Sequence, residues 1–263
     1  VYPTKKFSLD VDREAVKAMN FLPARDTSKI VNKMLWSIGN NGLNKGELIV
    51  LDIIATNAKQ GWKRPIYWTT TTGASVYLGL SKYLRNNGLT YQLLPVDANT
   101  RMRGMDDMDL LYDKLMNVYE WGNMEKGEMY LDDKAQLVPQ NLRSMFVQVA
   151  INFSNQNKHD SATALIDKCF ASMPETLLPV SLRLKAASAD IYYKAGKTEQ
   201  GDKFLSEAGD DAFELINYFN KFKTRGIQST EGDRNENLEI LRNIGMQAKR
   251  YGREEIATKY TDL

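Results

Sequence analysis

Residues 144–174 read SMFVQVAINFSNQNKHDSATALIDKCFASMP. Apolar side chains recur every three or four positions on both sides of the polar stretch at 155–160, which is the period of two helices joined by a turn. Ala150 and Ala162 place small side chains where two antiparallel helices would face each other, and small residues allow such helices to approach closely. The segment therefore predicts a helical hairpin.

The same spacing fits the tetratricopeptide repeat, in which apolar or small residues occupy fixed positions of a helical hairpin. The matching residues are Phe146, Val149, Ala150, Phe153, Ala162, Ile166, Cys169 and Pro174. Two weaker copies begin near Leu182 and near Asn237, with Gly201 and Ala257 in the place of Ala162. Because the three copies are unequally spaced, we expect an irregular tetratricopeptide-like α-helical solenoid over residues 99–263.

Residues 1–98 predict a small α/β layer, so the expected fold class is α+β, mainly α. Apolar spacing and capping residues predict helices at 26–38, 44–61 and 74–88 and strands at 7–11, 64–70 and 89–96. In the second helix, we expect the buried stripe to consist of Leu48, Leu51, Ile54 and Ala55. A strand, a helix and a second strand at short spacing are typical of a βαβ unit, so we expect the last two strands to lie parallel.

Composition excludes several classes of function. The 263 residues have a formal net charge of +2, which does not supply the dense basic face of a nucleic-acid-binding protein. One cysteine, Cys169, excludes an internal disulfide, and one histidine, His159, argues against a His-rich metal site or a Ser-His-Asp triad. No apolar run reaches the roughly 18 residues of a membrane span. We expect no metal, no cofactor and no catalytic residues, and the start at Val1 suggests a piece of a longer protein.

An aromatic segment, GWKRPIYWTTTTGASVYLGL at 61–80, is the first candidate site. Trp62, Tyr67 and Trp68 would form a sugar-stacking platform beside Arg64 if their rings shared one exposed surface. The alternative is that these rings belong to the core, which is the commoner role of aromatic residues on a short strand. Exposure of the rings distinguishes the two interpretations.

The second candidate site is the face that the first helix of each repeat would present to a peptide. The positions on that face are Ser144, Val147, Ile151, Ser154, Arg183, Ala186, Asp190, Tyr193, Glu239, Arg242, Met246 and Lys249. Among them, we expect Val147, Ile151, Arg183, Asp190, Tyr193, Arg242 and Lys249 to form the concave binding face. A Lys/Asn set that would clamp a C-terminal carboxylate is missing from the first two repeats. The alternative is that the repeats serve only as packing scaffold.

Several blocks together resemble a known family. These are LDIIATNAKQGWKRPIYWTTTTG, YLGLSKYLRNNGLTYQLLPV, LYDKLMNVYEWGNM, MYLDD and NLRSMFVQVA. They are similar to the C-terminal soluble region of a domain-of-unknown-function family of multi-spanning bacterial membrane proteins, related to protein O-mannosyltransferases. The likeness covers about residues 5–200.

This resemblance implies a periplasmic, tetratricopeptide-containing appendage tethered to a membrane domain that performs sugar transfer with lipid-linked donors. The acidic residues of that transfer site lie in the membrane part and have no counterpart here, so we expect this chain alone not to be an enzyme. We expect a scaffold that positions a protein or peptide partner or a glycan acceptor. The alternatives are a carbohydrate-binding region that contributes to glycosyl transfer and a free-standing repeat adaptor.

Overall fold

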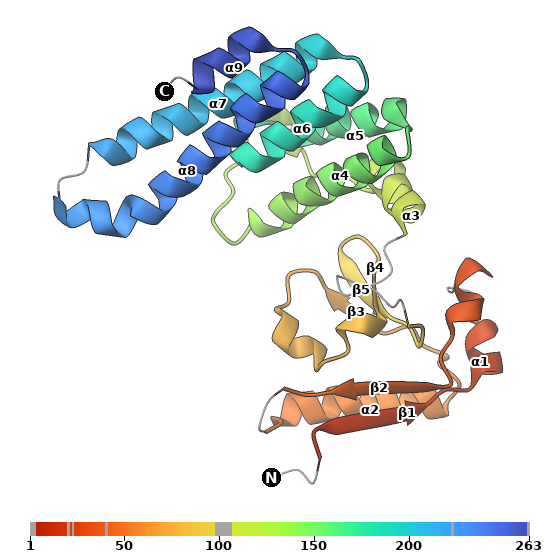
Figure 1. Cartoon of the computed structure of the whole chain (residues 1–263). Coiled ribbons are helices and arrows are strands. Elements are labelled where there is room, and N and C mark those ends of the chain that lie inside the picture. The colour runs from red at the N-terminus through yellow and green to blue at the C-terminus, as the bar shows by residue number, and fades with distance from the viewer. Residues whose placement is uncertain are drawn as a thin grey trace. The chain divides into compact units, whose positions relative to one another are not determined.

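The computed structural model describes residues 4–19, 22, 24–39, 42–97, 107–221 and 224–261, and of residues 25, 224–230 and 261 it describes the backbone alone. The chain divides into two compact units, Val1–Lys114 and Leu115–Leu263. The sequence placed the boundary after residue 98, within a polar connector predicted at 97–107, of which residues 98–106 lie outside the described residues. The first unit contains small antiparallel sheets and the second is helical, so the prediction of a mainly α fold with a small β part is confirmed (Figure 1).

The first sheet pairs β1 (Lys6–Asp10) with β2 (Lys33–Ser37) in antiparallel register. The strand predicted at 7–11 is confirmed, but the helix predicted at 26–38 is wrong. A 3-10 helix, η1 (Ala24–Lys29), is followed by β2, in which Met34 and Trp36 are buried and Leu35 is 54% exposed. Alternate residues face the core, so the segment has the period of a strand, and Trp36 stacks on Phe7 with ring centroids 5.6 Å apart.

Two helices accompany this sheet. α1 (Arg13–Lys17) is capped by the Asp12 carboxylate, and α2 (Lys45–Lys59) begins with a capping box formed by Asn44 and Glu47. The helix predicted at 44–61 is confirmed.

The stripe predicted on α2 is wrong in part. Leu48 is 49% exposed, whereas Ile54 and Asn57 are buried. The core side of α2 consists of the buried Ile54 and the partly buried Val50, Leu51 and Ala58, and Leu48 lies outside it.

The second sheet has the order β3 (Tyr67–Thr69), β5 (Thr90–Leu93), β4 (Leu84–Asn86), and both pairings are antiparallel. The predicted parallel βαβ unit is therefore wrong.

In place of the helix predicted at 74–88 there are two 3-10 helices, η2 (Ala74–Tyr77) and η3 (Ser81–Tyr83), followed by β4. Leu78 and Gly79 have φ values of 50° and 80°, which interrupt a right-handed helix, and Gly79 packs so closely on the Ser37 carbonyl that no Cβ fits.

The core of the first unit joins both sheets. Its largest fully buried side chains include Trp62, Met34, Ile54, Leu80 and Leu93. The unit ends with α3 (Met108–Asp113), capped by Asp107. A π-helical turn, η4 (Lys114–Val118), then leads into the second unit.

Two polar links connect the elements of the first unit. The Tyr83 hydroxyl donates to the Leu35 carbonyl and accepts from the Leu35 N–H, at 3.2 and 2.8 Å. The buried Arg85 guanidinium lies 3.5 Å from the Asp26 carboxylate. The first link ties β2 to η3, just before β4, and the second ties η1 to β4.

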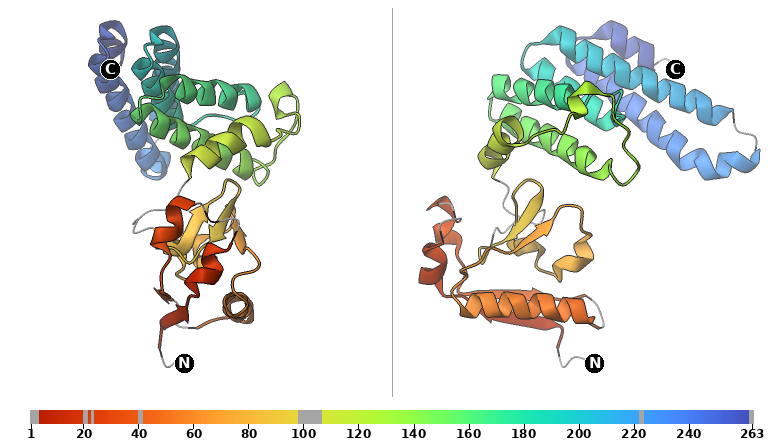
Figure 2. Two further views of the ribbon diagram at one scale, coloured as in Figure 1. Left: turned by 90° about the vertical axis from the view of Figure 1, so that its right-hand side faces the viewer. Right: turned by 180° about the vertical axis from the view of Figure 1, so that it is seen from behind.

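The second unit consists of a short 3-10 helix, η5 (Met124–Lys126), and three helical hairpins (Figure 1). The hairpins are α4 (Leu137–Asn155) with α5 (His159–Ser172), α6 (Leu182–Lys194) with α7 (Thr198–Asn220), and α8 (Thr224–Arg250) with α9 (Glu254–Thr261). Seen from behind in Figure 2, the blue α7 and α8 run past the shorter helices.

The three hairpin turns have the same backbone geometry. One residue in each turn has a positive φ, namely Asn157 at 61°, Gly196 at 73° and Gly252 at 67°. The N–H of the next residue donates to the carbonyl oxygen five residues earlier, and the N···O distance is 2.9 Å in all three turns. This 6→1 hydrogen bond is typical of a helix that ends at a left-handed residue. Each turn thus reverses the chain in the same way.

Small residues bring the paired helices together. Ala150 and Ala162, predicted to face each other in the first hairpin, are both fully buried. Gly201 of α7 lies against the Tyr193 ring of α6.

The buried Arg143 guanidinium fastens the connection between α5 and α6 to α4. It donates to the carbonyls of Met173, Leu178 and Pro179 at 2.6, 2.8 and 3.0 Å. The single guanidinium satisfies three backbone acceptors that a non-helical segment would otherwise leave unpaired.

Candidate functional site

The first helices of the three hairpins, α4, α6 and α8, pack next to one another, with α6 in contact with both others. A groove of about 410 Å³ runs across them, and we call it the first-helix groove. It is lined by Ile151, Ala186, Ala187, Asp190, Asn243, Met246, Gln247 and Arg250. Each of the three helices thus supplies part of the lining.

Apolar side chains flank a shallow floor in this groove. Ile151 of α4 is 40% exposed and Met246 of α8 is 52% exposed, whereas Ala186 and Ala187 of α6 contribute only methyl groups between them. A hollow between two exposed apolar side chains suits an apolar side chain of a ligand, because its entry removes apolar surface from water on both sides.

Asp190 is the charged centre of the groove. Its carboxylate pairs with Lys194 at 2.8 Å and lies 4.0 Å from Arg250. It also accepts a hydrogen bond of 2.7 Å from the Tyr251 hydroxyl. Burial, followed by this hydrogen bond, raises the pKa of Tyr251 from 10.0 to about 12, so the hydroxyl keeps its proton and donates at neutral pH.

Amide side chains complete the polar part of the groove. The Gln247 amide donates to the Ala186 carbonyl at 3.0 Å, which links α8 to α6 and orients the Gln247 oxygen. Asn243 lies exposed one turn before Gln247. A carboxamide offers both a donor and an acceptor, which is the pair that an extended peptide backbone requires.

The structure brings part of the predicted face together. Ile151 and Asp190 line the groove, together with Ala186 and Met246 from the wider set of face positions. Arg183 lies at the start of α6 and binds Glu236, outside this groove. The side chains of Arg242 and Lys249 are exposed on α8 without lining the groove.

Two residues of the predicted face do not face solvent. Val147 is 3% exposed, because α4 is covered by α6 as well as by α5. Tyr193 is 8% exposed, because its ring stacks on Tyr251 at 4.5 Å and its hydroxyl donates to Asp202 at 2.8 Å. Both belong to the packing between helices.

Three residues that line the groove, Asn243, Gln247 and Arg250, were not among the predicted face positions. Asn243 and Arg250 lie three positions before and four positions after Met246, and Gln247 lies four positions after Asn243, which is the spacing of neighbours on a helix surface. A search for such neighbours around each expected face position would have found them.

The aromatic segment does not form the single platform that a sugar site requires. Trp62 is 2% exposed and belongs to the core. Tyr67 is 42% exposed, whereas its neighbour Trp68 packs edge-on against Tyr77, because adjacent strand residues point to opposite faces. The Arg64 side chain is exposed, and its backbone is held by the Asn57 amide through two hydrogen bonds.

Within the ranges that the structure describes, no group of three His, Cys, Asp or Glu residues gathers to hold a metal ion. Within the same ranges, no helix has both the length and the apolar character needed to cross a membrane.

Comparison with known proteins reaches only the first unit. No curated protein and no solved structure matches the chain. Residues 1–111, nearly the whole of the first unit, match TMEM260-associated domain 2, an unknown-function domain family linked to membrane proteins.

Proposed function

We propose that this chain is a non-catalytic binding module in which tetratricopeptide-like helical repeats hold a segment of a partner protein in the first-helix groove. In its cellular setting, the module is the extramembrane part of a membrane glycosyltransferase-like protein, on the periplasmic side. The observation that carries the proposal is the groove itself, because side chains from three successive hairpins converge on it.

The repeated turn geometry supports the assignment to helical repeats. The three hairpins reverse at equivalent left-handed residues with equivalent hydrogen bonds. The positions that the tetratricopeptide pattern reserves for small residues, such as Ala150, Ala162 and Ala257, are fully buried. Stacked hairpins of this kind build an extended surface from repeated elements, which suits the binding of an extended ligand.

The lining of the groove favours a peptide segment over a small charged metabolite. Ile151 and Met246 receive an apolar side chain, and Asn243 and Gln247 lie where carboxamides can bind the peptide backbone. Asp190 already has Lys194, Arg250 and Tyr251 as partners, so it contributes a fixed polar edge. Specificity then comes from apolar anchors within a polar rim, as in other protein interfaces.

Two sequence similarities over the first unit support the membrane setting. The sequence blocks of the first unit resemble the soluble region of multi-spanning membrane proteins, and residues 1–111 match a domain family linked to membrane proteins. A repeat module tethered beside a membrane domain would position an acceptor protein for that domain.

The test is selection of peptides on the intact chain followed by affinity measurements. A peptide library displayed on phage is enriched on the purified chain, and the enriched peptide is labelled for fluorescence anisotropy. Ile151→Glu and Met246→Glu are each expected to weaken binding about tenfold or more, since roughly 1.4 kcal/mol per anchor corresponds to a factor of ten. Leu238→Glu is the matched control, because Leu238 is 42% exposed on α8 and lines neither this groove nor the one described below.

Two results would contradict the proposal. One is a failure to enrich any peptide whose affinity depends on Ile151 or Met246. The other is turnover of a nucleotide-linked or lipid-linked sugar by the purified chain, which would make the module an enzyme.

A further inference from the structure

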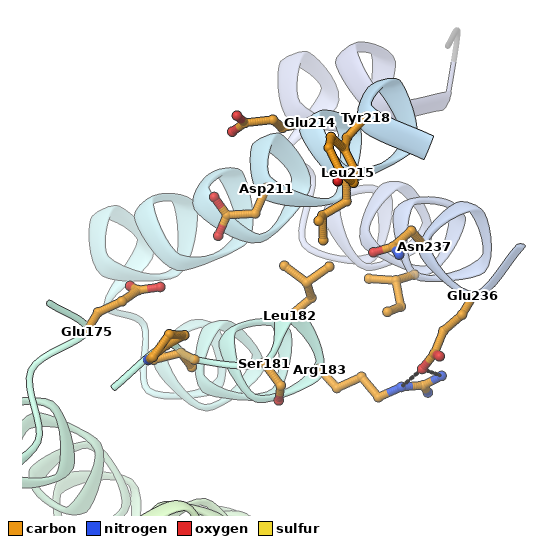
Figure 3. A pocket seen from close by; sticks show the side chains of 13 residues that line it. Glu175, Ser181, Leu182, Arg183, Asp211, Glu214, Leu215, Tyr218, Glu236 and Asn237 are labelled. Atoms are coloured by element: carbon orange, nitrogen blue, oxygen red, sulfur yellow. Dashed lines mark hydrogen bonds and ion pairs between the residues drawn. The ribbon is translucent and has the colours of Figure 1, made fainter. Parts of the chain in front are cut away.

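A second groove lies where α7 and α8 run past their neighbours. α7 has 23 residues and α8 has 27, whereas α6 has 13 and α9 has 8. Beyond the start of α6, the two long helices therefore form an extension with a groove of about 730 Å³ at its base (Figure 3). We call it the α6-end groove.

The inside of the α6-end groove is apolar. Val180 and Ile240 are each 8% exposed, whereas Leu215 and Tyr218 of α7 are 40% and 54% exposed. In Figure 3, Leu182 of α6 and Leu215 of α7 point into the same gap. Single exposed apolar residues are common on protein surfaces, but several that converge on one hollow are typical of a binding site.

The rim of this groove is acidic. It is formed by Glu175, Asp211, Glu214 and Glu236, and among the described lining residues Arg183 alone is basic. The buried Lys185 ammonium lies 2.6 Å from both Glu175 and Asp211, and Arg183 pairs with Glu236 at 3.1 Å.

Among the side chains that the structure describes around the groove, two cations therefore face four carboxylates. The start of α6 adds the equivalent of about half a positive charge, which leaves the rim negative. Within the described ranges, Glu214 has no ion-pair partner and is exposed. An approaching cation would find this carboxylate available.

We propose that the α6-end groove binds an amphipathic helix of a partner protein, with an apolar stripe against Leu215 and Ile240 and with Lys or Arg side chains at the acidic rim. This interaction is separate from the peptide segment assigned to the first-helix groove. It uses other residues of α6, α7 and α8.

The α6-end groove suits a helical ligand because, elsewhere along α7, another helix of the chain packs on the same side. Over the first half of α7, α6 fills the side that α7 and α8 share, since it contacts both helices. Beyond the start of α6, Leu215 is 40% exposed, so that side of the described α7 is only partly covered. From Asp211 to Tyr218, α7 offers two turns, about 10 Å, to a partner that continues in the place of α6. Two or three apolar residues at helical spacing would cover this length.

The test uses a pair of synthetic peptides of about 18 residues, a length at which a helix can form in isolation. Both carry Leu at every third or fourth position and a fluorophore, but one is flanked by Lys and the other by Glu. Binding to the whole chain is measured by fluorescence anisotropy. We expect the Lys peptide to bind about tenfold more tightly or better, and its affinity to fall when salt rises from about 0.05 M to about 0.5 M, because salt screens the exposed rim charges.

Variants locate the binding site. Glu214→Lys and Leu215→Arg are each expected to weaken binding of the Lys peptide about fivefold or more, as expected for loss of an interface anchor. Phe213→Arg is the apolar control, because Phe213 is 36% exposed on the same helix but does not line the groove. Glu199→Lys is the charge control, since Glu199 is exposed about 22 Å from Glu214 along α7, beyond the screening length at physiological salt.

Three results would overturn the inference. They are equal affinities of the Lys and Glu peptides, no binding of the Lys peptide, and equal losses in the groove variants and their controls. Met246→Glu separates the two proposals, because it alters the first-helix groove alone. If Met246→Glu abolishes binding of the Lys peptide and Leu215→Arg does not, the helix lies in the first-helix groove, and this inference fails while the proposed function stands.

Discussion

Gly201 of α7 lies against the ring of Tyr193 of α6, so closely that a Cβ on Gly201 would come 2.5 Å from the Tyr193 Cε1 atom. The ring is held in place by its stacking on Tyr251 and by its hydrogen bond to Asp202. The contact between the two helices of this hairpin therefore requires the absence of a side chain at position 201.

Replacing this glycine should destabilise the protein although alanine is the better helix former. We expect Gly201→Ala to lower the free energy of unfolding by about 1–3 kcal/mol, because overpacking against a fixed ring outweighs the helix-propensity gain of up to about 1 kcal/mol. Urea unfolding followed by far-UV circular dichroism measures the change.

Gly232→Ala is the control, because Gly232 lies in α8 with no atom near the position of a Cβ. At position 232 only the higher helix propensity of alanine should act, and it should stabilise the protein by about 0.5–1 kcal/mol. Equal stabilisation by both substitutions would contradict the close approach of Gly201 and Tyr193.

Removing the Arg143 guanidinium should cost more than removing an exposed arginine. In Arg143→Met, the carbonyls of Met173, Leu178 and Pro179 lose the donor that the structure gives them. We expect a loss of about 3 kcal/mol in the free energy of unfolding, since buried acceptors are left unsatisfied.

The free energy of unfolding of Arg143→Lys should fall between those of the wild type and Arg143→Met, because a lysine ammonium cannot reproduce the planar arrangement of donors on a guanidinium. Arg242→Met, on the exposed face of α8, should change stability by no more than about 0.5 kcal/mol. A loss in Arg143→Met no larger than in Arg242→Met would show that the three hydrogen bonds contribute little.

Cys169 makes stability depend on alkaline pH. Burial raises the pKa of the thiol from 9.0 to about 12, although the neighbouring Arg143 lowers it in part. Below pH 9 the thiol is protonated in both the folded and the unfolded chain. Above pH 9 only the unfolded chain ionises, so the contribution of the thiol to stability is lost as pH rises toward 12.

Between pH 7.5 and pH 9.8, we expect the wild type to lose about 1 kcal/mol more than Cys169→Ala, from the ionisation of the unfolded thiol alone. Urea unfolding of both proteins at the two pH values gives the difference, and the tyrosines affect both proteins alike. Identical losses, or rapid alkylation of Cys169 in the folded protein at pH 8, would show that the thiol is accessible.

Local sequence was sufficient where a single helix face or a single turn determines the outcome. The α4/α5 hairpin could be read from the spacing of its apolar residues and from Ala150 and Ala162, which are fully buried as expected. The start of α2 was likewise predicted at Asn44, and the structure adds Glu47, which completes a capping box with it.

Predictions from local sequence were wrong where the same residues fit both the period of a helix and the period of a strand. Ile30, Met34 and Ile38 fit a helix, but Met34, Trp36 and Ile38 also fit a strand, and pairing with β1 favoured the strand. At residues 74–88 the apolar spacing is helical, but Leu78 and Gly79 adopt positive φ values against the Ser37 carbonyl. The Asn87-Gly88 pair was the sign of an antiparallel hairpin between β4 and β5.

The amino-acid sequence by itself determined the class of the protein, a small β-containing unit followed by helical hairpins, because apolar periodicity and turn residues act over a few positions. Only the tertiary structure determined the surfaces. Packing between helices buries Val147 and Tyr193 and leaves Ile151 and Met246 partly exposed, although the repeat pattern assigns all four to the same predicted face. The excess length of α7 and α8 forms the α6-end groove, in which Leu215 and Tyr218 remain 40% and 54% exposed. Which side chains meet water depends on neighbours distant in sequence, and those neighbours are placed only when the whole chain folds.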